Sequence, residues 1–323
     1  MKALVATRFG TAPQMSLEDR PKPVGKPGYS VVKMYAATVN PLSAQIRQGV
    51  LDIAHPPLVL SNDGSGTVEE SAVFPAGTRV AIYGGGELGI TQDGLQQQWV
   101  CVENKRLFVL PDTLSLEEGA ALSINFITAY QALTRVGRVK AGQTVLISGA
   151  SGSVGHALSQ LAFSLGAVPI AIVSHASKIE AAQKSGVKTA LVFSEHTFQD
   201  AVLDATDGQG ADLAFDPVGG SLLPHLMAAL RPRGAVVSIG FVGGIESTLT
   251  LTDVIIHEKR LLGYDAWLET DEAVAQAFDA LRGFIVNGQV RPVIDSIWPL
   301  NDFEAAYDRL ASRRATGSIL LRC

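Results

Sequence analysis

The feature that most constrains the fold is a short glycine-rich run, Gly149-Ala150-Ser151-Gly152-Ser153-Val154-Gly155. A buried-strand pattern at 144–148 precedes it, and an apolar pattern with helical spacing follows at 154–165. Gly166 then stands where a helix normally ends. A second strand pattern begins at Val168. A strand, a glycine turn, a helix and another strand predict a parallel sheet covered by helices.

The glycine turn also predicts a ligand. It matches the dinucleotide-binding pattern Gly-x-Gly-x-x-Gly, with Ala150 in the first position. In this setting Gly152 lets the backbone approach a pyrophosphate, and Gly155 lets the helix pack close to the strand. The helix amino terminus adds free N–H groups and a favourable dipole. The alternative is a tight turn without a ligand. The predicted contacts of this segment are Ala150, Ser151, Gly152, Ser153, Val154 and Gly155.

The end of the second strand selects the cofactor. An NAD site usually has an acidic residue about 20 residues after the turn, which accepts hydrogen bonds from the ribose. Here Ser174-His175-Ala176-Ser177-Lys178 occupies that region, and no acid lies between Gly155 and Glu180. Hydroxyl donors and a lysine favour a 2′-phosphate. The sequence therefore predicts NADPH rather than NADH, unless Lys178 is an ordinary solvated lysine in the first turn of a helix.

Strand and helix patterns keep alternating after this unit, whereas residues 1–110 have a β pattern broken by Pro and Gly. The expected fold class is therefore α/β, with a doubly wound parallel sheet and a second, β-rich domain. We expect Ser115 and Glu118 to cap one helix and Asn301 and Glu304 to cap the last. A further helix is predicted at 271–286.

Composition excludes several classes of protein. The formal net charge of -5 argues against a general nucleic-acid binder, which needs clustered Lys and Arg. No apolar stretch is long enough to span a membrane. The two cysteines can form neither a disulfide framework nor a four-cysteine zinc site. These features predict a cytoplasmic protein without a membrane or nucleic-acid partner.

Several short motifs occur in order along nearly the whole chain. They are Ala37-Thr38-Val39-Asn40-Pro41, Ile46-Arg47-Gln48-Gly49, Asp63-Gly64-Ser65-Gly66-Thr67-Val68, Asn125-Phe126-Ile127-Thr128-Ala129-Tyr130, the glycine turn, Asp216-Pro217-Val218-Gly219-Gly220, Arg231-Pro232-x-Gly234 and Arg313-x-x-Thr316-Gly317. This set resembles the zinc-independent quinone oxidoreductase (zeta-crystallin-like) branch of the medium-chain dehydrogenase/reductase superfamily.

The resemblance implies two domains, with the cofactor in the cleft between them. A GroES-like β-rich domain would comprise residues 1–121 and 263–323, and a Rossmann domain would comprise residues 122–262. It also implies a homodimer formed through an edge strand of the Rossmann sheet, here around 236–242.

The resemblance further implies individual cofactor contacts. Asn40 and Thr128 would lie near the nicotinamide, and the backbone of Gly240-Phe241-Val242 would face the carboxamide. Phe193 stands where the family often has a tyrosine that contacts the 2′-phosphate, and Gln45 also replaces a tyrosine common in the family. The remaining implied contacts are Ser174, His175, Lys178 and Arg313 near the 2′-phosphate, and Val218.

The residues of a zinc alcohol dehydrogenase site are missing. Pro41-Leu42-Ser43 contains no Cys, Ser61-Asn62-Asp63 contains no His, and the six histidines show no ligand spacing. We therefore predict no metal. Without a Lewis acid, the feasible step is hydride transfer to an acceptor that is already electron-poor. Asn40 is predicted to position the acceptor, with Tyr130 and the 83–86 loop nearby; the alternative for Asn40 is a turn residue that satisfies local backbone.

The sequence thus predicts an NADPH-dependent reductase of quinones or α,β-unsaturated carbonyls, with a small electrophilic molecule as substrate. Two other functions stay open. One is an enoyl-thioester reductase of the same superfamily, acting on a CoA or carrier-protein substrate. The other is a non-catalytic nucleotide-binding protein with a crystallin-like or RNA-associated role, which the acidic net charge disfavours.

Overall fold

The computed structural model describes residues 1–323. The chain divides into two compact units. The first contains residues 1–124, 269–278 and 292–323, and the second contains residues 125–268 and 279–291. The second unit therefore extends beyond the predicted 122–262 at its carboxyl end and includes residues 279–291, which the sequence analysis assigned to the β-rich domain.

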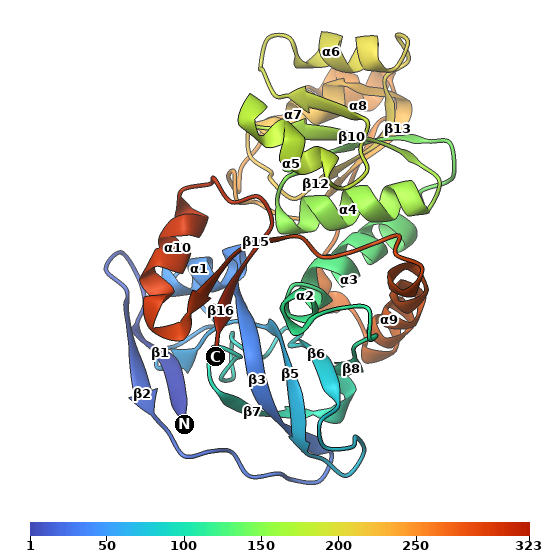
Figure 1. Ribbon diagram of the computed structural model, residues 1–323. Helices are drawn as coiled ribbons and strands as arrows, with labels where there is room; N and C mark the ends of the chain where they lie inside the picture. Colours follow the sequence, from blue (N-terminus) through green and yellow to red (C-terminus); the bar gives the residue numbers. More distant parts are fainter. The chain divides into compact units, whose positions relative to one another are not determined.

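The second unit is built on a six-stranded parallel sheet in the order β11-β10-β9-β12-β13-β14. Strands β10, β12 and β13 of this sheet are labelled in Figure 1. Strands β10 and β11 lie on one side of β9, and β12, β13 and β14 lie on its other side. Ligands of such sheets bind at the carboxyl ends of the strands, where the order reverses. The strands are β9 (Thr144–Ile147), β10 (Val168–Val173), β11 (Thr189–Val192), β12 (Ala211–Asp216), β13 (Leu230–Ser238) and β14 (Arg260–Gly263).

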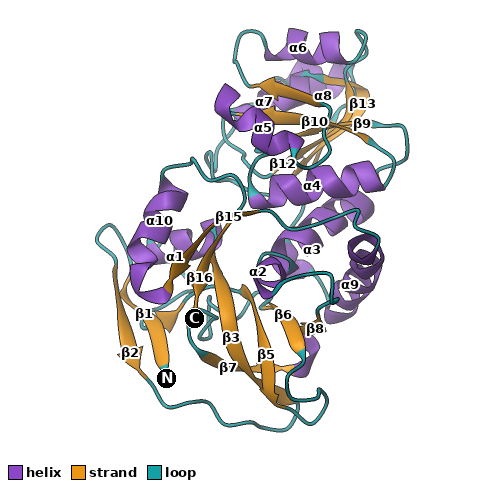
Figure 2. Ribbon diagram, viewed as in Figure 1, coloured by secondary structure: helices purple, strands orange, loops and turns teal.

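Helices alternate with these strands, as predicted (Figure 2). The helix after the glycine turn buries Ala157, Leu158 and Leu161, and Gly166 has a positive φ of 81° just past its end. The helical segments are α3 (Ser123–Gln131), the π-helix η2 (Ala132–Val136), α4 (Ser153–Ser164), η3 (Ala176–Lys178), α5 (Ile179–Gln183), α6 (Phe198–Ala205), α7 (Leu222–Ala228), α8 (Leu251–Ile256), η4 (Ala266–Leu268) and α9 (Asp271–Val286).

The first unit is mainly β, as its Pro- and Gly-broken pattern indicates. One sheet has the order β2-β1-β4, and a seven-stranded sheet has the order β15-β16-β3-β5-β6-β8, with β7 also paired to β3. The strands are β1 (Lys2–Arg8), β2 (Gln14–Asp19), β3 (Tyr29–Val39), β4 (Leu58–Val59), β5 (Asp63–Glu70), β6 (Arg79–Tyr83), β7 (Trp99–Glu103), β8 (Leu107–Val109), β15 (Ile294–Pro299) and β16 (Ser318–Arg322).

Short helices complete this unit, and one of the two predicted caps forms. Ser115 and Glu118 make the expected capping box at the start of α2. The cap predicted at Asn301 is wrong, because α10 begins at Phe303 after Asp302 without a capping side chain. Glu304 instead forms an ion pair with Arg47. The helices are α1 (Pro41–Arg47), η1 (Asn104–Arg106), α2 (Leu116–Ala120), η5 (Leu300–Asp302) and α10 (Phe303–Ala311).

The edge strand predicted around 236–242 is not an edge. β13 is hydrogen-bonded to β12 on one side and to β14 on the other. The short strand β14, which follows α8 and which the sequence patterns did not reveal, covers this side of β13. The open edges of the parallel sheet are β11 and β14. None of the helices is long and apolar enough to cross a membrane.

Candidate functional site

The glycine turn after β9 has a backbone that side chains would disrupt. Gly149 has a positive φ of 55°, which favours glycine. A Cβ on Gly155 would lie 2.2 Å from the carbonyl oxygen of Gly149 and 2.7 Å from the Cα of Ala150. Only a glycine at position 155 therefore lets α4 start so close to the turn.

The amino terminus of α4 is free to receive an anion. Gly152 is its N-cap, so no side chain accepts from the first-turn N–H groups, and the first turn contains no acidic residue. The unpaired N–H groups of a helix start and its dipole both attract negative charge. The turn and the helix start are thus arranged as a phosphate would require, and binding of the cofactor here stays a prediction.

Asp216 organises the next loop along the edge of the sheet. It is the last residue of β12, its side chain is fully buried, and its Oδ1 accepts from the Ser148 hydroxyl at 2.5 Å. Its carboxylate also accepts from the backbone N–H of Val218 at 3.0 Å and of Gly219 at 3.1 Å. One carboxylate therefore bonds both to the residue after β9 and to the loop after β12. These two strands are neighbours at the point where the strand order reverses.

The loops after β12 and β13 continue the same edge. A Cβ on Gly149 would lie 3.0 Å from Cγ2 of Val218, so the predicted contact Val218 lies beside the glycine turn. A Cβ on Gly240 would lie 2.6 Å from the carbonyl oxygen of Pro217. Phe241 and Val242 follow in the same loop with exposed side chains. The structure therefore places these predicted residues along one loop edge.

The segment after β10 lies beside the glycine turn, because the Ala150 N–H donates to the carbonyl of Ile172. Here His175 caps the short helix η3, accepting at Nδ1 from the Ser177 N–H at 3.2 Å. This turn carries Lys178, whose side chain is half-buried, and the predicted contact Ser174 is exposed just before it.

Phe193 follows β11, the neighbouring strand, and its N–H donates to the carbonyl of Val173 at 2.8 Å. Its ring packs edge-on against Phe198 and His225, with ring centroids 5.4 and 5.3 Å apart. The aromatic ring thus joins the apolar core of the unit. Its predicted contact with the cofactor stays a prediction.

The first unit has a buried polar cluster where β3 ends and β5 begins. The hydroxyl of Thr38 donates to Oδ1 of Asp63, and Nδ2 of Asn40 donates to the same oxygen at 3.1 Å. Nδ2 of Asn40 also lies 3.1 Å from Oδ1 of Asn62. Asp63 is fully buried, and this burial raises the pKa of its carboxyl to about 7, although the Thr38 and Asn40 hydrogen bonds oppose the rise.

Asn40 has a local structural role. It is the N-cap of α1, and its Oδ1 accepts from the Ser43 N–H at 2.8 Å in a capping box. Its amide nitrogen donates into the polar cluster, so both ends of the side chain have partners within the chain. The local geometry therefore fits the alternative in which Asn40 satisfies nearby backbone groups. Direct contact of Asn40 with a substrate stays a prediction.

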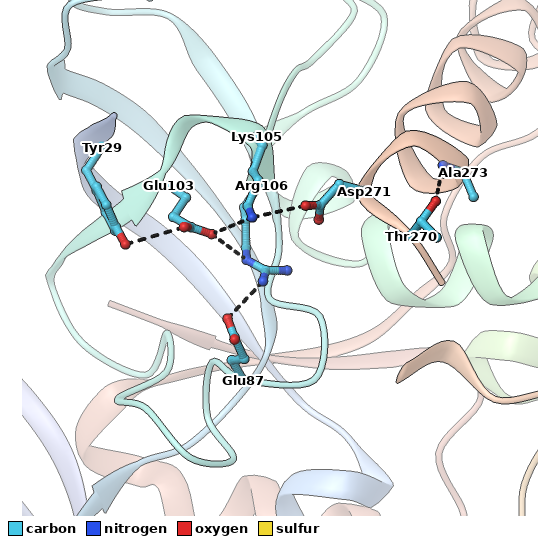
Figure 3. A network of polar contacts seen from close by, with 8 residues as sticks. All are labelled: Tyr29, Glu87, Glu103, Lys105, Arg106, Thr270, Asp271 and Ala273. Atoms are coloured by element: carbon cyan, nitrogen blue, oxygen red, sulfur yellow. Dashed lines mark hydrogen bonds and ion pairs between the residues drawn. The ribbon is translucent and has the colours of Figure 1, made fainter. Parts of the chain in front are cut away.

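A loop at 84–94 wraps around this cluster. A Cβ on Gly94 would lie 2.2 Å from the carbonyl oxygen of Ser61, and one on Gly85 would lie 2.4 Å from Nη1 of Arg106. Figure 3 shows how Arg106 holds the loop, bonding to Glu87 at 2.9 Å and pairing with Glu103 at 3.5 Å. These ion pairs fix the start of the loop, which overlaps the segment 83–86. The predicted position of that segment near the acceptor stays a prediction.

The remaining predicted residues are spread over both units. Thr128 is buried and Tyr130 is half-buried on α3, in the second unit. Arg313 is exposed just after α10, in the first unit, as is Asn40. Sequence reasoning assigned no role to Asp63 or Asp216, although each lies in a quoted motif. The signal for Asp216 was a carboxylate at the end of a buried apolar run, whereas Asp63 begins its strand and gave no such signal.

Two family models match the chain. Residues 26–112 match the alcohol dehydrogenase GroES-like domain, and residues 153–282 match the zinc-binding dehydrogenase family. A quinone oxidoreductase from Pseudomonas aeruginosa is 30% identical over 94% of this chain and 95% of its own length. The chain belongs to the medium-chain dehydrogenase/reductase superfamily. It is therefore an oxidoreductase, and its predicted family and fold class are confirmed.

Other similar proteins are named for different substrates and cofactors. A 2-haloacrylate reductase from a Burkholderia species is 29% identical over 92% of each chain. A solved structure described as an NAD-dependent alcohol dehydrogenase is 27% identical, with full coverage of both chains and a TM-score of 0.92. The quinone oxidoreductase of Thermus thermophilus, solved also with NADPH, is 28% identical, with full coverage of both chains and a TM-score of 0.86.

Proposed function

We propose that this chain is an NADPH-dependent reductase that transfers hydride to a quinone or an α,β-unsaturated carbonyl. The observation that carries the proposal is the carboxyl edge of the second unit. There an uncapped helix start and an ordered turn ending in Lys178 follow adjacent strands, β9 and β10. A pyrophosphate suits the helix start, and a 2′-phosphate suits a lysine that follows a serine in an ordered turn.

The residues of the first unit support an activated acceptor. The segments 41–43 and 61–63, where a zinc dehydrogenase would carry Cys and His, contain neither, and here Ser43 and Asn62 serve as hydrogen-bond partners of Asn40. Nicotinamide supplies the hydride when bound. The chain then has to hold the acceptor and offer hydrogen bonds to the oxygen on which charge develops. Quinones and enones fit, because their own carbonyl takes up that charge.

The cofactor choice is tested with Lys178→Ala. We expect this variant to bind NADPH about tenfold more weakly, with NADH affinity unchanged, because only NADPH has the 2′-phosphate. Nucleotide fluorescence titration measures both affinities. Lys188→Ala is the matched control, since Lys188 is an exposed lysine at the opposite, amino-terminal end of β11. An unchanged preference for NADPH over NADH in Lys178→Ala would remove this lysine from the cofactor site.

The acceptor is tested by NADPH oxidation with quinones, enones and enoyl-CoA thioesters. Turnover of the first two classes supports the proposal. Turnover of enoyl-CoA alone would favour an enoyl-thioester reductase. Tight nucleotide binding without turnover of any of them would favour a non-catalytic nucleotide-binding role.

We also propose a homodimer, formed through β14. This strand is an open edge, and Leu261 on it is exposed together with Leu251, Ile255 and Ile256 of α8. Unpaired strand edges beside apolar side chains are strong sites for self-association. We expect light scattering to give a dimer for the wild type and a monomer for Leu261→Lys. Val168→Lys is the control, because Val168 is similarly exposed on an inner strand; a monomeric wild type would overturn the proposal.

A further inference from the structure

The first unit contains a buried carboxyl that none of its ion pairs uses. Asp63 is the first residue of β5 and is 1% exposed. Its Oδ1 accepts from the Thr38 hydroxyl and the Asn40 amide, and both donors are neutral. A buried carboxyl is costly to ionise without a cation, and such groups are concentrated at functional sites.

The neighbours of Asp63 leave it without an opposing charge. Beyond Thr38 and Asn40, the cluster contains Ser61 and Asn62 from the preceding loop. Gln96 donates to the carbonyl of Thr38 at 3.0 Å and bonds on its other side to the Tyr307 hydroxyl.

Two buried tyrosines are the titratable groups next to this cluster. Tyr307 bonds to Gln96, and burial raises its pKa, so it stays neutral at physiological pH. Tyr83 lies opposite Asp63 on the neighbouring strand β6. The guanidinium of Arg47 lies over the ring of Tyr307 and forms an ion pair with Glu304. The charge state of Asp63 therefore depends on burial and on its two donors.

The hydrogen bonds of Asn40 make it sensitive to that charge state. Its Oδ1 is fixed by the Ser43 N–H, so its amide nitrogen faces the cluster, 3.1 Å from Oδ1 of both Asp63 and Asn62 and 3.3 Å from Oγ1 of Thr38. A carboxylate accepts such a hydrogen bond about twice as strongly as a neutral group does. Asn40 is half-buried, whereas the cluster members behind it are buried, so the cluster reaches the surface of the unit at Asn40.

We propose that Asp63 is a positioning residue of the reductase, which in its ionised form holds the side chain of Asn40, and with it the start of α1, in the conformation needed for turnover. The inference rests on the proposed function, because Asn40 is the residue expected to position the acceptor. Asp63 itself need not touch substrate or cofactor.

The proposal predicts how kcat depends on pH. The pKa of Asp63 is raised to about 7, so kcat should rise as the pH passes through about 7. Asp63→Asn keeps the shape but has no charge; we expect its kcat to be about tenfold lower above that pH, without the inflection. The KM for NADPH should not change. Asp295→Asn is the control, because Asp295 is a buried carboxylate of the same unit that is paired with Arg309; its profile should keep the wild-type inflection.

A second variant covers the case in which Asp63→Asn does not fold. The Thr38 hydrogen bond lowers the pKa of Asp63, so Thr38→Val should move the inflection upward by about one pH unit. Thr38→Ser keeps the hydroxyl and should restore the wild-type inflection. A residue with a merely structural role would change kcat at every pH without moving the inflection.

Stability gives a readout that needs no substrate. The folded-state pKa of Asp63 lies above the usual value of 3.8 for an aspartic acid, so its stabilising contribution is fully present below about pH 4 and is lost as the pH rises through about 7. Asp63→Asn should lack this decline in urea unfolding.

The outcomes separate the two proposals. A wild type that reduces no acceptor overturns the proposed function and this inference with it. Turnover by a wild type whose inflection persists in Asp63→Asn, or does not move in Thr38→Val, overturns this inference alone.

Discussion

Gly155→Ala is expected to destabilise the second unit and to weaken NADPH binding at least tenfold. The added Cβ would lie 2.2 Å from the carbonyl oxygen of Gly149. A backbone atom cannot move aside as a flexible side chain can, so α4 must shift away from the turn. Overpacking of this kind costs about 1–3 kcal/mol, and occasionally more. The shift also moves the helix start, on which the phosphate site depends.

Gly152→Ala is the matched control for this change. Gly152 has a φ of -88°, which alanine adopts freely, and its Cβ would lie 3.3 Å from the Gly149 oxygen. We expect this variant to lose much less stability to urea than Gly155→Ala and yet to bind NADPH more weakly, because the methyl group occupies the place where the backbone would approach the pyrophosphate. Equal urea midpoints for Gly155→Ala and the wild type would contradict the packing argument.

The fold was largely predictable because its signals are local. The glycine turn, the helical spacing after it and Gly166 define β9, α4 and the start of β10 within one continuous segment. The helix at Asp271–Val286 has the predicted bounds. The errors lie where the signal was weak. Glu118 completes the cap at Ser115 by accepting from the Ser115 N–H. Glu304 instead accepts from Arg47, which is far away in the sequence.

The site was only partly predictable. A sequence pattern predicts the phosphate turn, because all residues of the turn are consecutive in the chain. It does not show that Asp63 lies beside Thr38 and Asn40, since these residues meet only when β3 pairs with β5. Nor does the pattern show that both ends of the Asn40 side chain are used within the chain. Hydrogen bonds between distant segments decide these roles, and register is needed to find them.

Asp216→Asn is the second change with a large expected effect. The fully buried carboxylate of Asp216 accepts from the Ser148 hydroxyl and from the N–H groups of Val218 and Gly219, and Gly219 approaches both oxygens at 3.1 Å. An amide of the same size replaces one acceptor by a donor, which leaves at least one buried donor without a partner. Such a loss costs about 1–3 kcal/mol for each group. We expect urea unfolding to show it.

The same change should weaken NADPH binding, because Asp216 holds the loops on both sides of the reversal in strand order. Asp212→Asn is its matched control. Asp212 lies on the same strand and also bridges to β9, accepting from the Thr144 N–H at 2.8 Å, but at the amino-terminal edge of the sheet. Both variants should lose stability, and only Asp216→Asn should lose NADPH affinity, by about tenfold. An equal loss of affinity in the two variants would mean that general loosening of the sheet, and not the carboxylate between the two loops, controls the nucleotide site.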